Sequence, residues 1–234
     1  QTKAAVLSHA LPKFALLETM YWEPETGIFL EELHLQRMQR SADYFSYSVD
    51  LQSIMSALKD VSEKLPLQPH KIRLLVHPDN FDIKALSIRG KTEPLKACLA
   101  AQAVQSLDVF LYHKTTHRPM YAEALQTFPD MDDVLLYNEH GYITEFCFGN
   151  LVYEDDGQFF TPPVEDGLLA GTFREFLLTT NQIREKSLAV DALDSSKLYR
   201  INSVQKWLRV ELMGAMNVGM EGLSRKVKED GGVI

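Results

Sequence analysis

The stretch Asp132–Arg174 has the sequence DDVLLYNEHGYITEFCFGNLVYEDDGQFFTPPVEDGLLAGTFR, and it decides the fold. Two apolar runs, 134–137 and 142–145, flank a polar turn and predict a β-hairpin. A second pair, 150–153 and 158–160, flanks an acidic turn and predicts another. Four short strands in close succession indicate that this half of the chain is rich in β-structure.

The end of the stretch predicts a helix with an open N-terminus. Gly171 and Thr172 precede apolar residues at helical spacing, Phe173, Phe176 and Leu177. Free backbone N–H groups at such a helix start can bind a phosphate or a carboxylate, and a glycine allows close approach. The same pattern is also typical of an ordinary turn, so the residues alone leave both interpretations open.

Upstream, Lys114 lies in the polar segment 112–118, just after the apolar run 109–111. Taken alone it could be a surface lysine. A lysine that is partly desolvated and close to cations has a lowered pKa, which would give a neutral amine able to attack an aldehyde.

The N-terminal part predicts strands and helices in turn. A strand at 14–22 and a short partner at 28–30 flank a turn, and a hairpin is expected at 71–77 and 81–88. Between them, two helices are expected to follow Glu31 and the N-cap Asp50. The first has two faces, an apolar one with Leu35, Met38, Ala42 and Phe45, and a polar one with His34, Arg37, Ser41 and Tyr44. Further elements are expected at about 118–128 and 171–180 (helices) and at 185–190 and 198–204 (strands).

Composition excludes several classes of protein. The net charge is −8, and no block of Lys or Arg is long enough for a nucleic-acid or membrane-surface patch. No apolar stretch approaches the length of a membrane span, so we expect a cytoplasmic protein. Cys98 and Cys147 have neither disulfide nor zinc spacing and are expected to be buried apolar residues. His113 and His117 are four residues apart but lack a further ligand at suitable spacing, so no metal site is expected.

Four groups of residues, in this order, resemble the class IV aminotransferase family, the fold type IV enzymes that use pyridoxal 5′-phosphate (PLP). They are His34-Leu35-Gln36-Arg37-Met38, the Lys114 segment, Thr144-Glu145 followed by Asn150-Leu151, and Gly171-Thr172-Phe173-Arg174. The resemblance implies an α+β fold, with a small α/β N-terminal domain (1–110), a β-rich, barrel-like C-terminal domain (111–234) and the cofactor between them. Residues 95–104 have the propensity of a helix, but the resemblance implies that they form a strand.

The resemblance implies a role for each site residue. Lys114 would bind the cofactor aldehyde and then move protons, and Glu145 would keep the pyridine nitrogen protonated. Arg37 would bind the phosphate with the backbone of Thr172 and Phe173 and the Thr172 hydroxyl. Many members have a threonine where this chain has Phe173, so one hydroxyl contact is missing. Gly171, Asn202 and Ser203 would also face the cofactor, and Arg118 and Tyr112 the substrate.

Within the family, the chain most resembles aminodeoxychorismate lyase and the lyase-like domain fused to aminodeoxychorismate synthase component I. The resembling residues include Leu17-Glu18-Thr19 and Asn202-Ser203-Val204. Thr19 aligns with the threonine that lyase members use to protonate the departing enolpyruvate. The resemblance implies a small-molecule substrate, a homodimer, and possible association with, or derivation from, the synthase. An aminotransferase and a catalytically inert binding domain are the alternatives.

Overall fold

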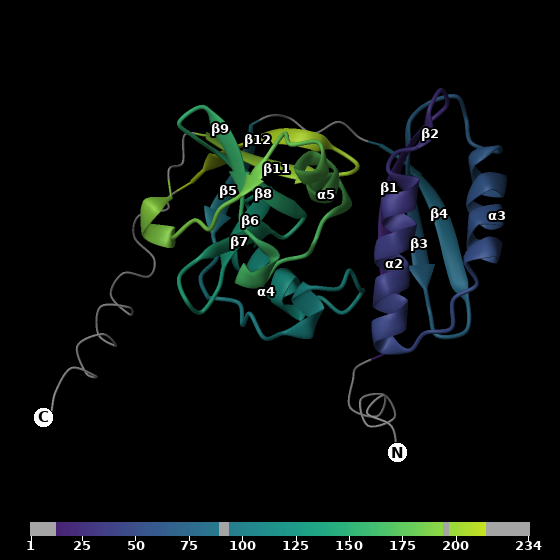
Figure 1. Cartoon of the computed structure of the whole chain (residues 1–234), viewed down its shortest axis with the longest axis horizontal. Helices are drawn as coiled ribbons and strands as arrows, with labels where there is room; N and C mark the ends of the chain where they lie inside the picture. The colour runs from purple at the N-terminus through teal and green to yellow at the C-terminus, as the bar shows by residue number, and fades with distance from the viewer. Residues whose placement is uncertain (1–12, 89–93, 194–196, 214–234) are drawn as a thin grey trace, which may run out of the picture.

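The computed structural model describes residues 13–88, 94–193 and 197–213. Two sheets form two parts that lie side by side (Figure 1). The small part contains a four-stranded antiparallel sheet in the order β2-β1-β3-β4. Its strands are β1 (Leu16–Glu23), β2 (Gly27–Ile28), β3 (His70–Val76) and β4 (Phe81–Ser87).

Two helices, α2 (Glu31–Phe45) and α3 (Leu51–Ser62), pack on one face of the small sheet (Figure 1). Alternate residues of β1 and β3, such as Met20 and Ile72, point into the core beneath them, where they meet Met38 and Leu58. Asp50 caps α3 as predicted, because its carboxylate accepts the backbone N–H groups of Gln52 and Ser53.

The large part is a barrel-like sheet. Its strands follow the order β10-β9-β8-β11-β12-β5-β6-β7, and a further pairing of β7 with β8 closes a ring. The strands are β5 (Leu95–Leu99), β6 (Asp133–Tyr137), β7 (Ile143–Phe146), β8 (Gly149–Asp155), β9 (Gln158–Thr161), β10 (Arg184–Glu185), β11 (Leu198–Asn202) and β12 (Lys206–Leu212). The predicted hairpins of 132–174 are confirmed as β6–β7 and β8–β9. The predicted α+β class with a barrel-like second part is confirmed.

Two α-helices accompany this sheet, α4 (Pro119–Thr127) and α5 (Thr172–Thr179), both as predicted. Among the described residues, short 3-10 helices connect other elements: η1 (Val109–Leu111), η2 (Val164–Asp166) and η3 (Val190–Ala192). None of the described helices is both long and apolar enough to cross a membrane.

Several predicted boundaries were wrong. The strand expected at 95–104 ends at Leu99, and beyond it only Val104 makes an isolated bridge, to Asn138. The strand expected at 185–190 shrinks to the two-residue β10, and no strand was expected where β12 lies. Single polar residues alternate with apolar ones in β12, and its position between β11 and β5 supplies both partners.

The polar face of α2 also differs from an ordinary solvated face. His34, Arg37 and Ser41 are buried, and only Tyr44 of that set is exposed.

The division into domains at residue 110 stays a prediction. Sheet membership favours an earlier boundary, because β5 belongs to the large sheet. The outer ends of both predicted domains, 1–12 and 214–234, lie outside the described residues.

Candidate active site

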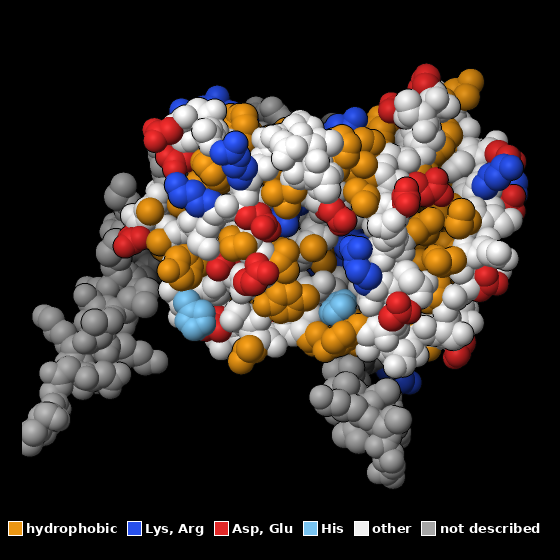
Figure 2. Space-filling view, viewed as in Figure 1, with side chains coloured by type: hydrophobic (Ala, Val, Ile, Leu, Met, Phe, Trp, Pro, Cys, Tyr) orange, Lys and Arg blue, Asp and Glu red, His pale blue; other side chains and the backbone are white. Residues whose placement is uncertain are grey.

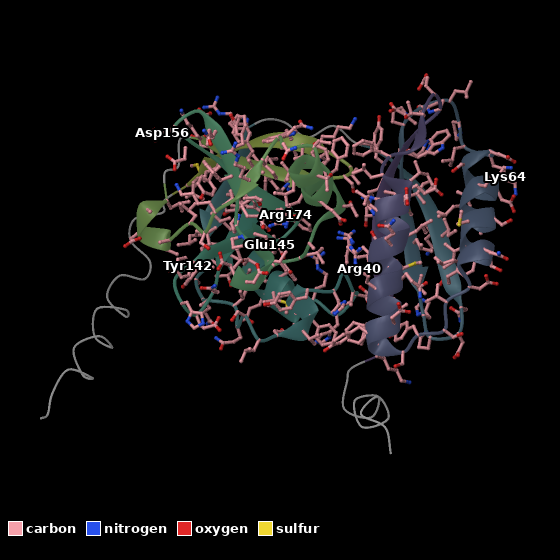
Figure 3. All side chains as sticks on the ribbon, viewed as in Figure 1. Arg40, Lys64, Tyr142, Glu145, Asp156 and Arg174 are labelled. Carbon is pink, nitrogen blue, oxygen red and sulfur yellow. The ribbon has the colours of Figure 1, made fainter. Side chains whose placement is uncertain are left out.

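A cavity of about 560 Å³ lies where the two parts meet. Residues from both parts line it, including Thr19 of β1 and Arg37 of α2 on the small side. Figure 3 shows Glu145 within the large part and Arg40 on α2, the helix that faces it. Every site residue predicted from the sequence lines the cavity except Tyr112: Thr19, Arg37, Lys114, Arg118, Glu145, Gly171, Thr172, Phe173, Asn202 and Ser203.

Lys114 is fixed in the cavity by its own backbone. Its carbonyl accepts the N–H of Leu17 at 2.8 Å, and the N–H of Thr116 donates to Ala15 at 2.9 Å, so the segment pairs with the start of β1. Burial lowers the pKa of Lys114 to about 7, and the charges of Arg37 and Arg118 add to this effect against Glu18 and Glu145. A large fraction of this amine is therefore neutral near pH 7, as nucleophilic attack on an aldehyde requires.

Glu145 on β7 faces the same cavity and is almost fully buried. Its carboxylate accepts the Tyr121 hydroxyl at 2.7 Å, the Asn150 amide at 3.2 Å and the Leu169 backbone N–H at 3.3 Å. Burial raises the pKa of Glu145 to about 7, although the hydrogen bonds from Tyr121 and Leu169 and the cations Arg118 and Lys114 act in the opposite direction. A carboxyl in this state can exchange a proton with a basic ring nitrogen beside it.

Gly171 keeps the start of α5 open. A Cβ at this position would lie 2.0 Å from Oδ1 of Asn150, whose amide donates to the Leu169 carbonyl at 2.8 Å. Any side chain here would displace Asn150, which also contacts Glu145. No side chain caps the helix, so its first N–H groups remain available for an anion.

Sequence reasoning assigned no role to Glu18 or His34, although both were in the quoted motifs. The Glu18 carboxylate accepts Nε and Nη2 of Arg37 at 2.9 and 2.5 Å, and His34 Nδ1 lies 2.7 Å away. Burial by itself would raise the pKa of Glu18, but the charge of Arg37 and the bonds from His34 lower it to about 2. Arg37 also reaches the Ala170 carbonyl at 3.3 Å, which directs it toward α5. The signal in the sequence was a carboxylate on the strand that precedes an HxxR helix.

Tyr121 is a third residue whose role the sequence did not give. Its hydroxyl binds Glu145, and the Arg118 guanidinium lies 4.3 Å from the centre of its ring. Arg118 also donates to the Cys147 carbonyl at 2.6 Å. Helix α4 therefore places the Tyr121 hydroxyl on the carboxylate, and its N-cap residue Arg118 supplies a positive charge nearby.

The remaining predicted residues have more limited contacts. Asn202 accepts the N–H groups of Val204 and Gln205, a turn role, while Ser203 donates to the Thr19 carbonyl at 3.2 Å. The Phe173 side chain packs in the core beside Phe29. A substrate role for Tyr112 is not supported, because its hydroxyl donates to the Ser106 carbonyl at 2.7 Å and its side chain packs in the core around α4.

The cavity fits PLP on chemical grounds. It combines an amine with a lowered pKa, a buried carboxyl close to neutrality, a buried guanidinium and a helix start that only glycine leaves open. Among residues 13–88, 94–193 and 197–213, no group of three His, Cys, Asp or Glu could hold a metal ion. The fold and this set of residues agree with those expected for a fold type IV enzyme that uses PLP.

Comparisons with known proteins agree. The model of the family described as amino-transferase class IV matches residues 15–213. A Schizosaccharomyces pombe protein named "Putative aminodeoxychorismate lyase" is 29% identical over 196 residues, 78% of this chain and 80% of its own length. The chain belongs to the amino-transferase class IV family, whose members depend on PLP.

Two solved structures show the same fold. The crystal structure of a "Putative amino-acid aminotransferase" from Mesorhizobium loti has a TM-score of 0.80 and 29% identity, covering 86% of this chain and all of the other. That of a "Putative 4-amino-4-deoxychorismate lyase" from Legionella pneumophila has a TM-score of 0.75 and 19% identity, covering 92% and 89%. The relatives thus carry the names of two different reactions.

Proposed function

We propose that this chain is a 4-amino-4-deoxychorismate lyase, which releases pyruvate and leaves 4-aminobenzoate. The observation that supports this choice is Thr19, a hydroxyl residue in the same cavity as Lys114, on the strand that pairs with the Lys114 segment. A lyase needs an acid for the departing enolpyruvate, and a transaminase does not. The name of the Schizosaccharomyces pombe relative is consistent with this proposal.

In this proposal the side chains that line the cavity divide the work between them. Bound PLP supplies an electron-accepting ring. The Lys114 amine holds the cofactor and then removes the proton from the substrate ring carbon that bears the amino group. Glu145 keeps the proton on the pyridine nitrogen, and Tyr121 and Asn150 hold Glu145 in place. Arg37 and the start of α5 bind the phosphate.

Thr19 would complete the reaction. The bond between the substrate ring and the enolpyruvyl oxygen breaks, and the Thr19 hydroxyl delivers a proton to the methylene carbon of the departing enolpyruvate, which becomes the methyl group of pyruvate. One proton leaves the ring and one reaches the product, so the reaction needs no oxidant and no second substrate. Formation of the aromatic ring makes the elimination favourable.

The alternative is an aminotransferase acting on a small amino acid or amine. The Mesorhizobium loti structure, at 29% identity over the full length of that chain, favours it. To distinguish the lyase from the aminotransferase, the PLP-loaded protein is incubated with aminodeoxychorismate, and pyruvate and 4-aminobenzoate are assayed separately. Transfer of an amino group to a keto acid, with no pyruvate formed from aminodeoxychorismate, would assign the chain to the alternative.

Thr19→Val tests the proton donor with little change in shape. We expect pyruvate release to fall by roughly 100-fold or more, the lower range of a general-acid contribution, while PLP still attaches to Lys114. The attachment is measured by absorbance and by mass spectrometry after borohydride reduction. Thr19→Ser, which keeps the hydroxyl, is the matched control and should retain most of the activity. Equal losses in both variants would contradict the role of the hydroxyl.

The predicted homodimer and any association with aminodeoxychorismate synthase remain proposals. Light scattering of the purified chain, alone and mixed with the synthase, tests both.

On the face shown in Figure 2, acidic and basic side chains are interspersed over both parts, a distribution without the basic stripe of a nucleic-acid-binding surface.

A further inference from the structure

His34 is completely buried, and both of its ring nitrogens have partners. Nδ1 lies 2.7 Å from Glu18 Oε2, and Nε2 lies 3.3 Å from the Thr172 hydroxyl at the start of α5. The three side chains form one chain of contacts from β1 through α2 to the helix start that lines the cavity. This chain connects an anion of the small part to the helix start that is the proposed phosphate site.

The direction of each hydrogen bond follows from the donors available. Glu18 already accepts two N–H groups from Arg37, and its low pKa keeps it ionised, so it can only accept from His34. His34 Nδ1 must therefore carry a proton. In the neutral ring Nε2 is then an acceptor, and the Thr172 hydroxyl must donate to it.

This arrangement has a consequence for an anion at α5. While Thr172 donates its only proton to His34, it presents lone pairs to the cavity, and phosphate oxygens also carry lone pairs. If His34 gains a proton, Nε2–H donates to the Thr172 oxygen and frees the hydroxyl proton to point at the anion. The expectation that the Thr172 hydroxyl binds phosphate thus holds only for the protonated histidine.

We propose that His34 is a positioning residue whose protonation turns the Thr172 hydroxyl toward an anion at the start of α5, so that anion binding and proton uptake by His34 promote each other. The inference rests on the proposed placement of the cofactor phosphate. It does not depend on which reaction the enzyme catalyses. By reciprocity, the factor by which the proton tightens anion binding equals the factor by which the anion tightens proton binding.

The charges around His34 determine the pH range in which anion binding and protonation of His34 are coupled. Glu18 of β1 favours the protonated ring, whereas Arg37 of α2 and Lys114 oppose it, and Thr172 of α5 is neutral. Burial lowers the pKa of His34 below its usual 6.5, so the ring is mainly neutral at pH 7 without an anion. A dianion beside Thr172 adds negative charge and should raise the pKa.

Sulfate is the suitable probe, because it is a divalent anion that does not titrate between pH 5 and 8, unlike phosphate. Nitrogen NMR of histidine-labelled protein without cofactor reports the tautomer and the pKa of His34, which is identified by its loss in His34→Asn. We expect the Nδ1–H tautomer near neutral pH and a higher pKa in saturating sulfate. An Nε2–H tautomer, or a pKa that sulfate does not move, would overturn the proposal.

The second measurement is the sulfate dissociation constant as a function of pH. All variants carry Lys114→Ala, which removes the titration of that lysine, and the contribution of Glu145 is common to all of them. With His34 present, affinity should rise as the pH falls through the pKa of His34, by at most about tenfold per pH unit for one proton. His34→Asn keeps a donor for Glu18 but cannot titrate, and should lose this component.

Thr172 supplies the matched pair. Thr172→Val lacks the hydroxyl and should lose the His34-dependent component, while Thr172→Ser should keep it. Equal pH dependence in the valine and serine variants would show that the hydroxyl does not transmit the effect, and would overturn the proposal. Since no step of catalysis is measured, a failed lyase assay leaves these outcomes unchanged.

Discussion

Two buried carboxylates line or border the same cavity, and their pKa values are shifted in opposite directions. Glu18 in the small part is lowered to about 2, and Glu145 in the large part is raised to about 7. Both are desolvated, so burial does not distinguish them. The hydrogen-bond donors do: Glu18 faces the charged Arg37 and the His34 ring, whereas Glu145 is bound by a phenol, an amide and a backbone N–H. One carboxylate is a fixed anion, and the other can hold or release a proton.

The largest expected effect on stability comes from removing the fixed anion, Glu18. Glu18→Ala leaves Arg37 buried without its partner, which should lower the free energy of unfolding by roughly 3–5 kcal/mol. Urea denaturation of the protein without cofactor measures it. Glu175→Ala is the matched control, because its pair with Arg40 spans 3.5 Å between partly exposed side chains and should contribute less than about 1 kcal/mol. A loss at Glu18 no larger than in the control would show that the buried pair is not needed.

The next effect concerns Lys114 and the pH dependence of stability without cofactor. The folded-state pKa of about 7 lies below the ordinary value of 10.5, so between these values the unfolded chain binds more protons. This contribution to stability therefore increases as the pH rises from about 7 to 10.5, by up to a few kcal/mol. Lys114→Met should remove that increase in urea denaturation curves taken across the interval.

Glu145 should have the opposite effect at lower pH. Its folded-state pKa of about 7 lies above the ordinary 4.5, so the folded chain binds more protons between the two values and its contribution decreases as the pH rises from 4.5 to 7. Glu145→Gln should remove this decrease. If the slope of stability against pH in either window is the same in the variant and the unmodified chain, the corresponding pKa shift is contradicted.

A smaller effect is expected for Arg37. This residue belongs to the small part, and we propose that it binds the cofactor phosphate together with the start of α5 in the large part. Arg37→Ala should weaken PLP retention by about 10- to 100-fold, or roughly 1.5–3 kcal/mol, through loss of a charge-assisted contact. Equilibrium dialysis of PLP measures it, and Arg40→Ala, on the same helix but half exposed, should leave it unchanged. Unaltered PLP affinity in a folded Arg37→Ala protein would contradict the phosphate role.

The smallest effect is expected for Tyr121→Phe, which removes one neutral donor from Glu145. Stability should fall by about 0.5–1.5 kcal/mol, and the pKa of Glu145 should rise further, because the lost hydrogen bond was lowering it. The shift appears as a displaced pH profile of stability. Tyr112→Phe removes a hydroxyl that binds Ser106 away from the cavity, and should not displace the profile.

The contrast between the two carboxylates also separates what the sequence could and could not predict. Local pattern predicted the strand that carries Glu145 and the helix start at Gly171, because both follow signals within one continuous stretch, and the family resemblance then implied their place at the cofactor. Glu18 contacts His34 and Arg37 only because β1 packs beneath α2, and Tyr121 reaches Glu145 only through the placement of α4. These contacts depend on tertiary packing, which no local period encodes. The strand β12 was not predicted either: it forms a hairpin with β11, but its other partner, β5, is distant in sequence.

The hairpin of β7 and β8, which closes the barrel, restricts the length of the turn between these two strands. Glu145 and Asn150 are directly opposite each other on β7 and β8, joined by only Cys147 and Phe148 between the strands. Adding or removing one residue there would shift the register of β8 against β7, so that Asn150 would no longer lie opposite Glu145. The turn between Asp155 and Gln158 joins β8 to β9 through residues that do not line the cavity, so it carries no such restriction. We therefore expect functional relatives to vary in length at the second turn and to keep the first constant.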